Sequence, residues 1–244
     1  MPSWLDLFFV VLVFGVLLLV DGFVLVPRFR ARVAAGLPGA RIAGYRRAAF
    51  AQSVITVVML AGWMASGRSW AALGLAPAGG TRFFVALGLI AAILALAVTQ
   101  VRGIRRIGAS VEQRDVNRKR FTELAFMLPG TADEYRWFVV LSVVAGICEE
   151  LMCRGYLVWV LQAYVGLAAA VILSAAIFGV GHMYQGCRGV VKTGVVGLVM
   201  NAIVLAGGWL VPAMLVHALI DATSGLLAYT VLRDGQREVL KAPV

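Results

Sequence analysis

The feature that most constrains this chain is a series of continuous apolar stretches, each of roughly 18 or more residues, the length that spans a hydrocarbon core of about 30 Å as a helix. In lipid, only helices and closed barrels satisfy every backbone hydrogen bond, and barrel strands alternate apolar and polar residues. Here the apolar runs are unbroken. The sequence therefore predicts an all-α fold, a polytopic transmembrane helix bundle. Its composition agrees, since 61% of the residues are hydrophobic, the mean hydropathy is +0.91 and only 14% are charged.

The boundaries of the apolar runs predict about seven transmembrane helices within one membrane domain that covers residues 1–244. Residues 1–127 are expected to form a scaffold with basic loops, and residues 128–231 the helices that carry the polar side chains. An eighth, amphipathic surface helix is an option at residues 115–128, with a solvated basic loop as the alternative. The predicted helices cover residues 4–26, 48–66, 82–101, 137–162, 165–183, 190–206 and 209–231.

The net charge of +10 lies mainly in the connections between the apolar runs. The first, third and fifth connections and the C-terminal tail are basic, whereas the second, fourth and sixth hold few or no basic residues. This distribution indicates membrane topology rather than a nucleic-acid partner. By the positive-inside rule, the N-terminus is expected outside and the C-terminus in the cytoplasm. The short, Arg-rich loops favour a bacterial plasma (inner) membrane.

Other residues give weaker signals. The first apolar run is expected to be a retained helix rather than a cleaved signal, because no Lys or Arg precedes Arg28. Asn201 is expected to form an interhelical hydrogen bond, and Asp21 to meet loop arginines. The small residues Gly179 and Gly181 would let neighbouring helices approach closely. Three cysteines without a CxxC pair indicate neither a disulfide framework nor a Cys-rich zinc site.

Two adjacent glutamates and an arginine interrupt the apolar run at 137–162. Glu150 and Arg154 are four residues apart on one helix face and are expected to form an ion pair. Glu149 points about 100° away on the helical wheel and is left without that cation. A carboxylate without a cationic partner suits a general base. An ion pair that only fixes helix packing is the alternative reading of this segment.

The two histidines of the chain both fall in its apolar second half. His182 ends the fifth predicted helix, and His217 lies in the seventh, with Asp221 one turn later on the same face. A single histidine in a helix bundle is usually a packing residue. Two histidines together with Asp221 and the glutamate pair instead point to a functional site.

In this order, the three polar motifs resemble those of the CPBP membrane proteases, which include the type II CAAX prenyl endopeptidases and bacterial relatives of the bacteriocin-processing and immunity type. The resemblance covers residues 128–229. It rests on EExxxR at 149–154, FxxxH at 178–182 and HxxxN/D at 217–221.

The resemblance implies a glutamate-dependent, metal-independent endopeptidase with no cofactor, acting on a membrane-associated peptide or protein substrate such as a CAAX-like protein or a precursor peptide. The family motif usually ends in Asn, and an ionised Asp221 cannot donate a hydrogen bond to an oxyanion. Asp221 must therefore be protonated or must orient His217. The implied roles are general base for Glu149, its partner for His182, oxyanion site for His217 and Asp221, and support for Glu150 and Arg154.

Three alternatives remain open at this point. A His₂Glu zinc site assembled from the two histidines and Glu149 is the minority reading, because the sequence has no HExxH segment. A non-catalytic binding or immunity partner would use the same fold. An ion-coupled transporter would also explain buried carboxylates, but such transporters usually contain internal repeats, and none is visible in this sequence.

Overall fold

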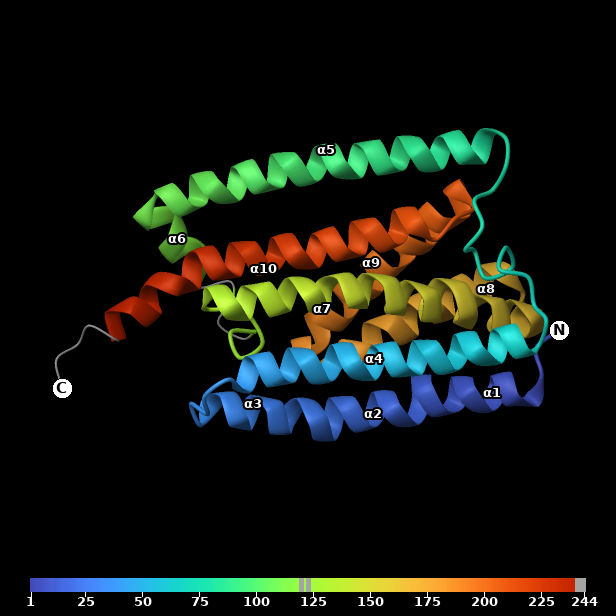
Figure 1. The fold of residues 1–244 in the computed structure, drawn as a ribbon, viewed down its shortest axis with the longest axis horizontal. Helices are drawn as coiled ribbons and strands as arrows, with labels where there is room; N and C mark the ends of the chain where they lie inside the picture. Colours follow the sequence, from blue (N-terminus) through green and yellow to red (C-terminus); the bar gives the residue numbers. More distant parts are fainter. Residues whose placement is uncertain (119–120, 122–123, 240–244) are drawn as a thin grey trace.

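The computed structural model describes residues 1–118, 121 and 124–239, and all regular structure within these ranges is helical. Six helical stretches are long and apolar enough to cross a membrane, which makes the chain a multi-pass membrane protein. Figure 1 shows most of these stretches lying with their axes roughly parallel, while the stretch Met183–Gly207 runs obliquely behind them. The α-helices are α1 (Trp4–Val10), α2 (Leu18–Val20), α3 (Val26–Ala34), α4 (Ala40–Ala65), α5 (Thr81–Ala109), α6 (Val111–Arg118), α7 (Ala132–Glu150), α8 (Val158–Gly181), α9 (Gly186–Gly207) and α10 (Val211–Val239).

Short π-helical or 3₁₀ segments join several of these helices. The π-helical segments Val11–Leu17 and Asp21–Leu25 link α1, α2 and α3 into one continuous stretch, Trp4–Ala34. A third π-helical segment, Leu151–Leu157, joins α7 to α8. The 3₁₀ turn Met183–Gln185 precedes α9.

The longest apolar stretch, Ala132–Gly181, contains 50 residues, more than the roughly 20 that one crossing needs. Its helix is broken at Gly166, where φ is 78° and ψ is 162°. Glycine adopts this positive φ without a steric penalty. Beyond the break the chain turns back, and the Ser174 hydroxyl donates a 2.8 Å hydrogen bond to the Cys153 carbonyl. This reversal divides the stretch into two packed segments, so the six apolar stretches of the described residues contain seven long helical segments, the number that the sequence predicted.

The predicted surface helix at residues 115–128 is only partly right. α6 ends at Arg118 and residues 124–127 form turns, while residues 119–120 and 122–123 lie outside the described ranges. Side chains of α4 bind the turn carbonyls in place of helical hydrogen bonds. Arg41 donates to the carbonyls of Ala125 and Phe126, and the Tyr45 hydroxyl donates to the Met127 carbonyl at 2.7 Å. The connection is therefore docked on α4.

Glycines set the closest helix contacts. A Cβ atom at Gly146 of α7 would lie 2.9 Å from the backbone of α10, at Ala218 N and Met214 O. A Cβ at Gly179 of α8 would lie 2.6 Å from the Val190 carbonyl of α9, which confirms the predicted close approach there. At Gly181 the corresponding contact is an ordinary 3.5 Å, so that glycine is not required for packing.

A buried ion pair between Asp6 and Arg68 links α1 to the connection that follows α4. Both carboxylate oxygens of Asp6 accept 2.7 Å hydrogen bonds from Arg68, and the Tyr156 hydroxyl donates to the same carboxylate at 2.8 Å. The hydrogen bond from Asp6 raises the pKa of Arg68 above its ordinary value. Residue spacing does not predict these contacts, because Asp6, Arg68 and Tyr156 lie far apart along the chain.

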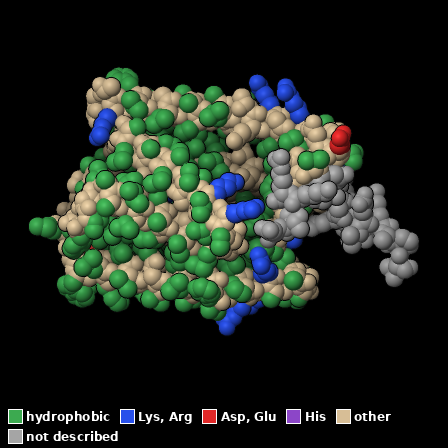
Figure 2. Space-filling view, turned by 180° about the vertical axis from the view of Figure 1, so that it is seen from behind, with side chains coloured by type: hydrophobic (Ala, Val, Ile, Leu, Met, Phe, Trp, Pro, Cys, Tyr) green, Lys and Arg blue, Asp and Glu red, His purple; other side chains and the backbone are tan. Residues whose placement is uncertain are grey.

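The outer surface matches a lipid environment. Many large apolar side chains are exposed along the helices. Figure 2 shows this apolar surface and a concentration of Lys and Arg toward the end of the molecule that carries the C-terminus.

Candidate active site

The predicted ion pair between Glu150 and Arg154 is present. Arg154 Nη1 lies 3.0 Å from Glu150 Oε1, and both side chains are fully buried. The Arg154 guanidinium also lies over the Phe178 ring, 4.1 Å from its centroid. The pair thus connects the end of α7 to the helix that carries His182.

His217 on α10 lies among three carboxylates. Its Nδ1 is 2.7 Å from Glu150 Oε1, and because a carboxylate only accepts, Nδ1 donates in this contact. Its Nε2 is 3.8 Å from Glu149 Oε2 and 3.6 Å from Asp221 Oδ2. These two distances are too long for direct hydrogen bonds. Glu150 therefore fixes the ring, and Nε2 faces Glu149 and Asp221.

Glu149 has no cationic side chain within ion-pair distance except His217 among the described residues, as its position on the helical wheel predicted. Its Oε1 instead accepts a 2.7 Å hydrogen bond from Gln52 Nε2 on α4. The Glu149 side chain is 18% exposed, in contrast to the fully buried Glu150. Gln52 was not among the predicted site residues. Its position within an otherwise apolar predicted helix, residues 48–66, could have marked it as a candidate.

His182 is oriented by its own helix. Its Nδ1 lies 2.8 Å from the Phe178 carbonyl, so Nδ1 donates and Nε2 keeps a free lone pair when the ring is neutral. Phe178 contacts both histidines, with ring-centroid distances of 4.7 Å to His182 and 5.9 Å to His217. Within the described ranges, no hydrogen bond joins His182 to Glu149. The structure thus brings His182 to the cluster through the Phe178 ring.

Asp221 lies at the accessible edge of the cluster, with 40% of its side chain exposed. It lies one turn after His217 and approaches the same imidazole nitrogen that faces Glu149. Five of the six predicted residues lie within ion-pair distance of one another, while His182 is linked to them through the Phe178 ring. These five residues are Glu149, Glu150, Arg154, His217 and Asp221.

Asn201 and Asp21 have the kinds of partner that the sequence predicted. Asn201 of α9 donates to the Gly197 carbonyl at 3.1 Å in its own helix and to the Val171 carbonyl of α8 at 3.5 Å, which is the expected interhelical bond. Asp21 interacts electrostatically with Arg47, as expected, and also with Glu149 and His182.

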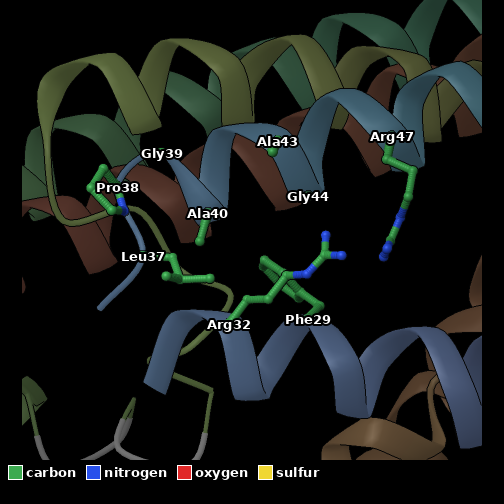
Figure 3. Close-up of a pocket in the computed structure, with 9 residues that line it drawn as sticks. All are labelled: Phe29, Arg32, Leu37, Pro38, Gly39, Ala40, Ala43, Gly44 and Arg47. Carbon is green, nitrogen blue, oxygen red and sulfur yellow. The ribbon is translucent and has the colours of Figure 1, made fainter. Parts of the chain in front are cut away.

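No side chain of the three motifs lines the pocket shown in Figure 3. This pocket has a volume of about 360 Å³ and lies between α3 and α4. The pocket is lined by Phe29, Arg32, Leu37, Pro38, Gly39, Ala40, Ala43, Gly44 and Arg47.

Across the residues that the structure describes, no group of three or more His, Cys, Asp or Glu side chains has an arrangement suited to a metal ion.

Residues 131–223 match the family model described as Type II CAAX prenyl endopeptidase Rce1-like. This segment contains all three motifs, so the resemblance that they indicated is confirmed. No curated protein and no solved structure matches the chain. The matched segment begins at the N-cap of α7 and excludes the helices before it.

Proposed function

We propose that this membrane protein, whose residues 131–223 match the Rce1-like type II CAAX prenyl endopeptidase family, is an intramembrane endopeptidase that uses Glu149 to activate water. The observation that carries this proposal is the placement of His217. Its Nδ1 is held by Glu150, and its Nε2 faces Glu149, whose carboxylate has no arginine or lysine partner within the described residues. One glutamate thereby supports the site, and the other stays available to accept a proton.

In the proposed reaction, a water molecule near Glu149 Oε2 gives a proton to that carboxylate while its oxygen attacks the carbonyl carbon of the scissile peptide bond. The His182 Nε2 lone pair accepts a hydrogen bond from the same water and helps to orient it. The new C–O bond places negative charge on the carbonyl oxygen of a tetrahedral intermediate. Collapse of this intermediate breaks the C–N bond, and protonated Glu149 returns its proton to the leaving amine.

His217 is proposed to stabilise the oxyanion. As an imidazolium it donates through Nδ1 to Glu150 and through Nε2 to the oxyanion. Asp221, 3.6 Å from Nε2, is proposed to orient the ring and to balance its charge, which is the second of the two roles left open by the sequence. In this assignment Asp221 acts through His217 and need not donate a hydrogen bond itself.

The substrate is proposed to be a membrane-associated peptide or protein, either a CAAX-like protein or a precursor peptide. The first experiment compares the membrane proteomes of cells that carry the wild-type chain or Glu149→Gln. A precursor that accumulates only in the mutant identifies the substrate. The purified protein in detergent is then given that precursor and, in parallel, a prenylated CAAX peptide, which separates the two substrate classes.

Glu149→Gln is expected to lower the cleavage rate by roughly 10²- to 10⁴-fold, the usual contribution of a general base. His182→Ala should act in the same direction. Glu112→Gln is the matched control, because Glu112 is exposed on α6 and has no part in the cluster. Undiminished cleavage by Glu149→Gln would overturn the mechanism. A cellular phenotype that survives combined Glu149→Ala and His182→Ala would instead show a binding or immunity role.

The proposal also includes metal independence. Cleavage by the purified protein is expected to persist after exhaustive dialysis against a chelator, because the proposed proton acceptor is a carboxylate and the proposed oxyanion donor is His217. Activity that disappears on chelation and returns with added zinc would establish the His₂Glu alternative. A measurement of bound metal before and after dialysis shows that removal was complete.

A further inference from the structure

Gln52 of α4 contacts the proposed general base from outside the family-matched segment. Its Nε2 lies 2.7 Å from Glu149 Oε1. The amide orientation follows from this contact, because the reverse orientation would place the Gln52 carbonyl oxygen against a carboxylate oxygen. In this orientation Gln52 Oε1 is buried and has no hydrogen-bond partner among the described residues.

The hydrogen bond makes the two oxygens of Glu149 different. Oε1 is engaged by Gln52, whereas Oε2 faces His217 Nε2 at 3.8 Å. A carboxylate fixed through one oxygen presents the other in a defined direction. For a general base, this geometry matters because proton transfer requires hydrogen-bond reach to the reacting water.

The chemistry of the donor also suits the role. Glu150 is held by the guanidinium of Arg154, which carries a full positive charge. Glu149 is held by a neutral amide, which supplies a hydrogen bond without that charge. Gln52 therefore restrains Glu149 without forming an ion pair with it.

We propose that Gln52 is a positioning residue that directs Glu149 Oε2 toward the attacking water. This inference rests on the proposed function, since it assigns the orientation of the same general base. It also extends the working site beyond residues 131–223 to α4 of the N-terminal region. The N-terminal helices then contribute to catalysis as well as to the scaffold.

The test is Gln52→Met, which keeps a side chain of similar length and removes the donor. The kcat for cleavage is expected to fall about ten- to a hundredfold, the equivalent of one hydrogen bond to a charged group, with KM unchanged within about twofold. Gln100→Met is the matched control, because the Gln100 amide accepts a hydrogen bond from Thr223 of α10 rather than donating to Glu149. The control should keep the wild-type kcat.

A double-mutant cycle separates positioning from general structural damage. Glu149→Asp withdraws the carboxylate from Gln52 by one methylene, so Gln52→Met should cause little further loss in that background. Equal losses from Gln52→Met in both backgrounds, or an unchanged kcat in the single mutant, would overturn the inference. Glu149→Gln distinguishes the two proposals: if it is inactive while Gln52→Met keeps wild-type kcat, only the role of Gln52 fails. Full activity of Glu149→Gln would remove the proposed function itself.

Discussion

At the level of single residues, two adjacent glutamates are held by opposite kinds of partner. Glu150 is fully buried and contacts both Arg154 and His217. Glu149 is partly accessible and accepts a hydrogen bond from the neutral Gln52. Burying a charge is costly unless it is paired, so Glu150 needs its cation, whereas Glu149 at the accessible edge does not. The difference in surroundings gives the two carboxylates their different proposed roles.

Removal of Arg154 is expected to destabilise the fold. Arg154→Met leaves the buried Glu150 without its main cation, and breaking a buried ion pair in this way typically costs about 3–5 kcal/mol of unfolding free energy. The measurement is the free energy of unfolding, or the thermal midpoint, of the purified protein in detergent. Cleavage activity should fall in parallel, because Glu150 also holds His217.

Arg136→Met provides the matched control. Arg136 pairs with Asp133 at 2.8 Å, but both side chains are more than two-thirds exposed, at 78% and 72%. An exposed pair of this kind contributes less than about 1 kcal/mol. If Arg154→Met were no more destabilising than Arg136→Met, the buried pair would have no structural role.

The cluster could be predicted only where its contacts are local in sequence. The spacing of Glu150 and Arg154 on one helix face is enough to predict their ion pair, and the structure confirms it. The contact between His217 and Glu150 joins residues 67 positions apart, and that between Gln52 and Glu149 joins residues 97 apart. These distances depend on how helices pack, which residue spacing alone does not determine.

At the level of helices, the position of α10 against α7 determines the site. Gly146 lies one turn before Glu150 and packs directly on the backbone of α10 near His217. Gly146→Ala would place a Cβ 2.9 Å from Ala218 N and Met214 O, so the two helices must separate. Overpacking of this type costs about 1–3 kcal/mol. We expect lower thermal stability and a larger loss of kcat, since His217 would move away from the glutamates.

Gly62→Ala is the control for this substitution. Gly62 lies in α4, and a Cβ there meets no atom within 4 Å. Because alanine favours a helix over glycine by about 0.5–1 kcal/mol, this variant should be as stable as the wild type or slightly more so. Wild-type activity and stability in Gly146→Ala would show that the α7–α10 contact tolerates expansion.

Helix positions were more predictable than helix ends. The apolar runs predicted the positions of the seven long helical segments, because burial in lipid requires length and low charge. The ends were less accurate: the first helical stretch continues to Ala34 and α5 to Ala109, since arginine side chains let a helix extend into the headgroup region. For residues 115–128 the sequence left a surface helix and a loop open. Spacing alone could not decide between them, because Arg41 and Tyr45 of α4 bind the carbonyls of this connection.

At the level of the whole molecule, alternation of charge between connections is reflected in the arrangement of the helices. Figure 1 shows the α3–α4 connection, α6 and the C-terminal end of α10 at one end of the bundle, and the N-terminus and the α4–α5 connection at the other. The first group contains the Arg-rich connections of the sequence. We propose that this end faces the cytoplasm, which places the N-terminus outside.

A native cysteine can test this orientation. Cys187 is exposed at the start of α9, next to Arg188, whereas Cys148 and Cys153 are buried. If the basic end is cytoplasmic, a membrane-impermeant thiol reagent should label the wild-type chain only after the cells are permeabilised. Ala72→Cys, placed in the α4–α5 connection in a Cys187→Ser background, should be labelled in intact cells. Labelling of Cys187 in intact cells, with Ala72→Cys protected, would reverse the proposed topology.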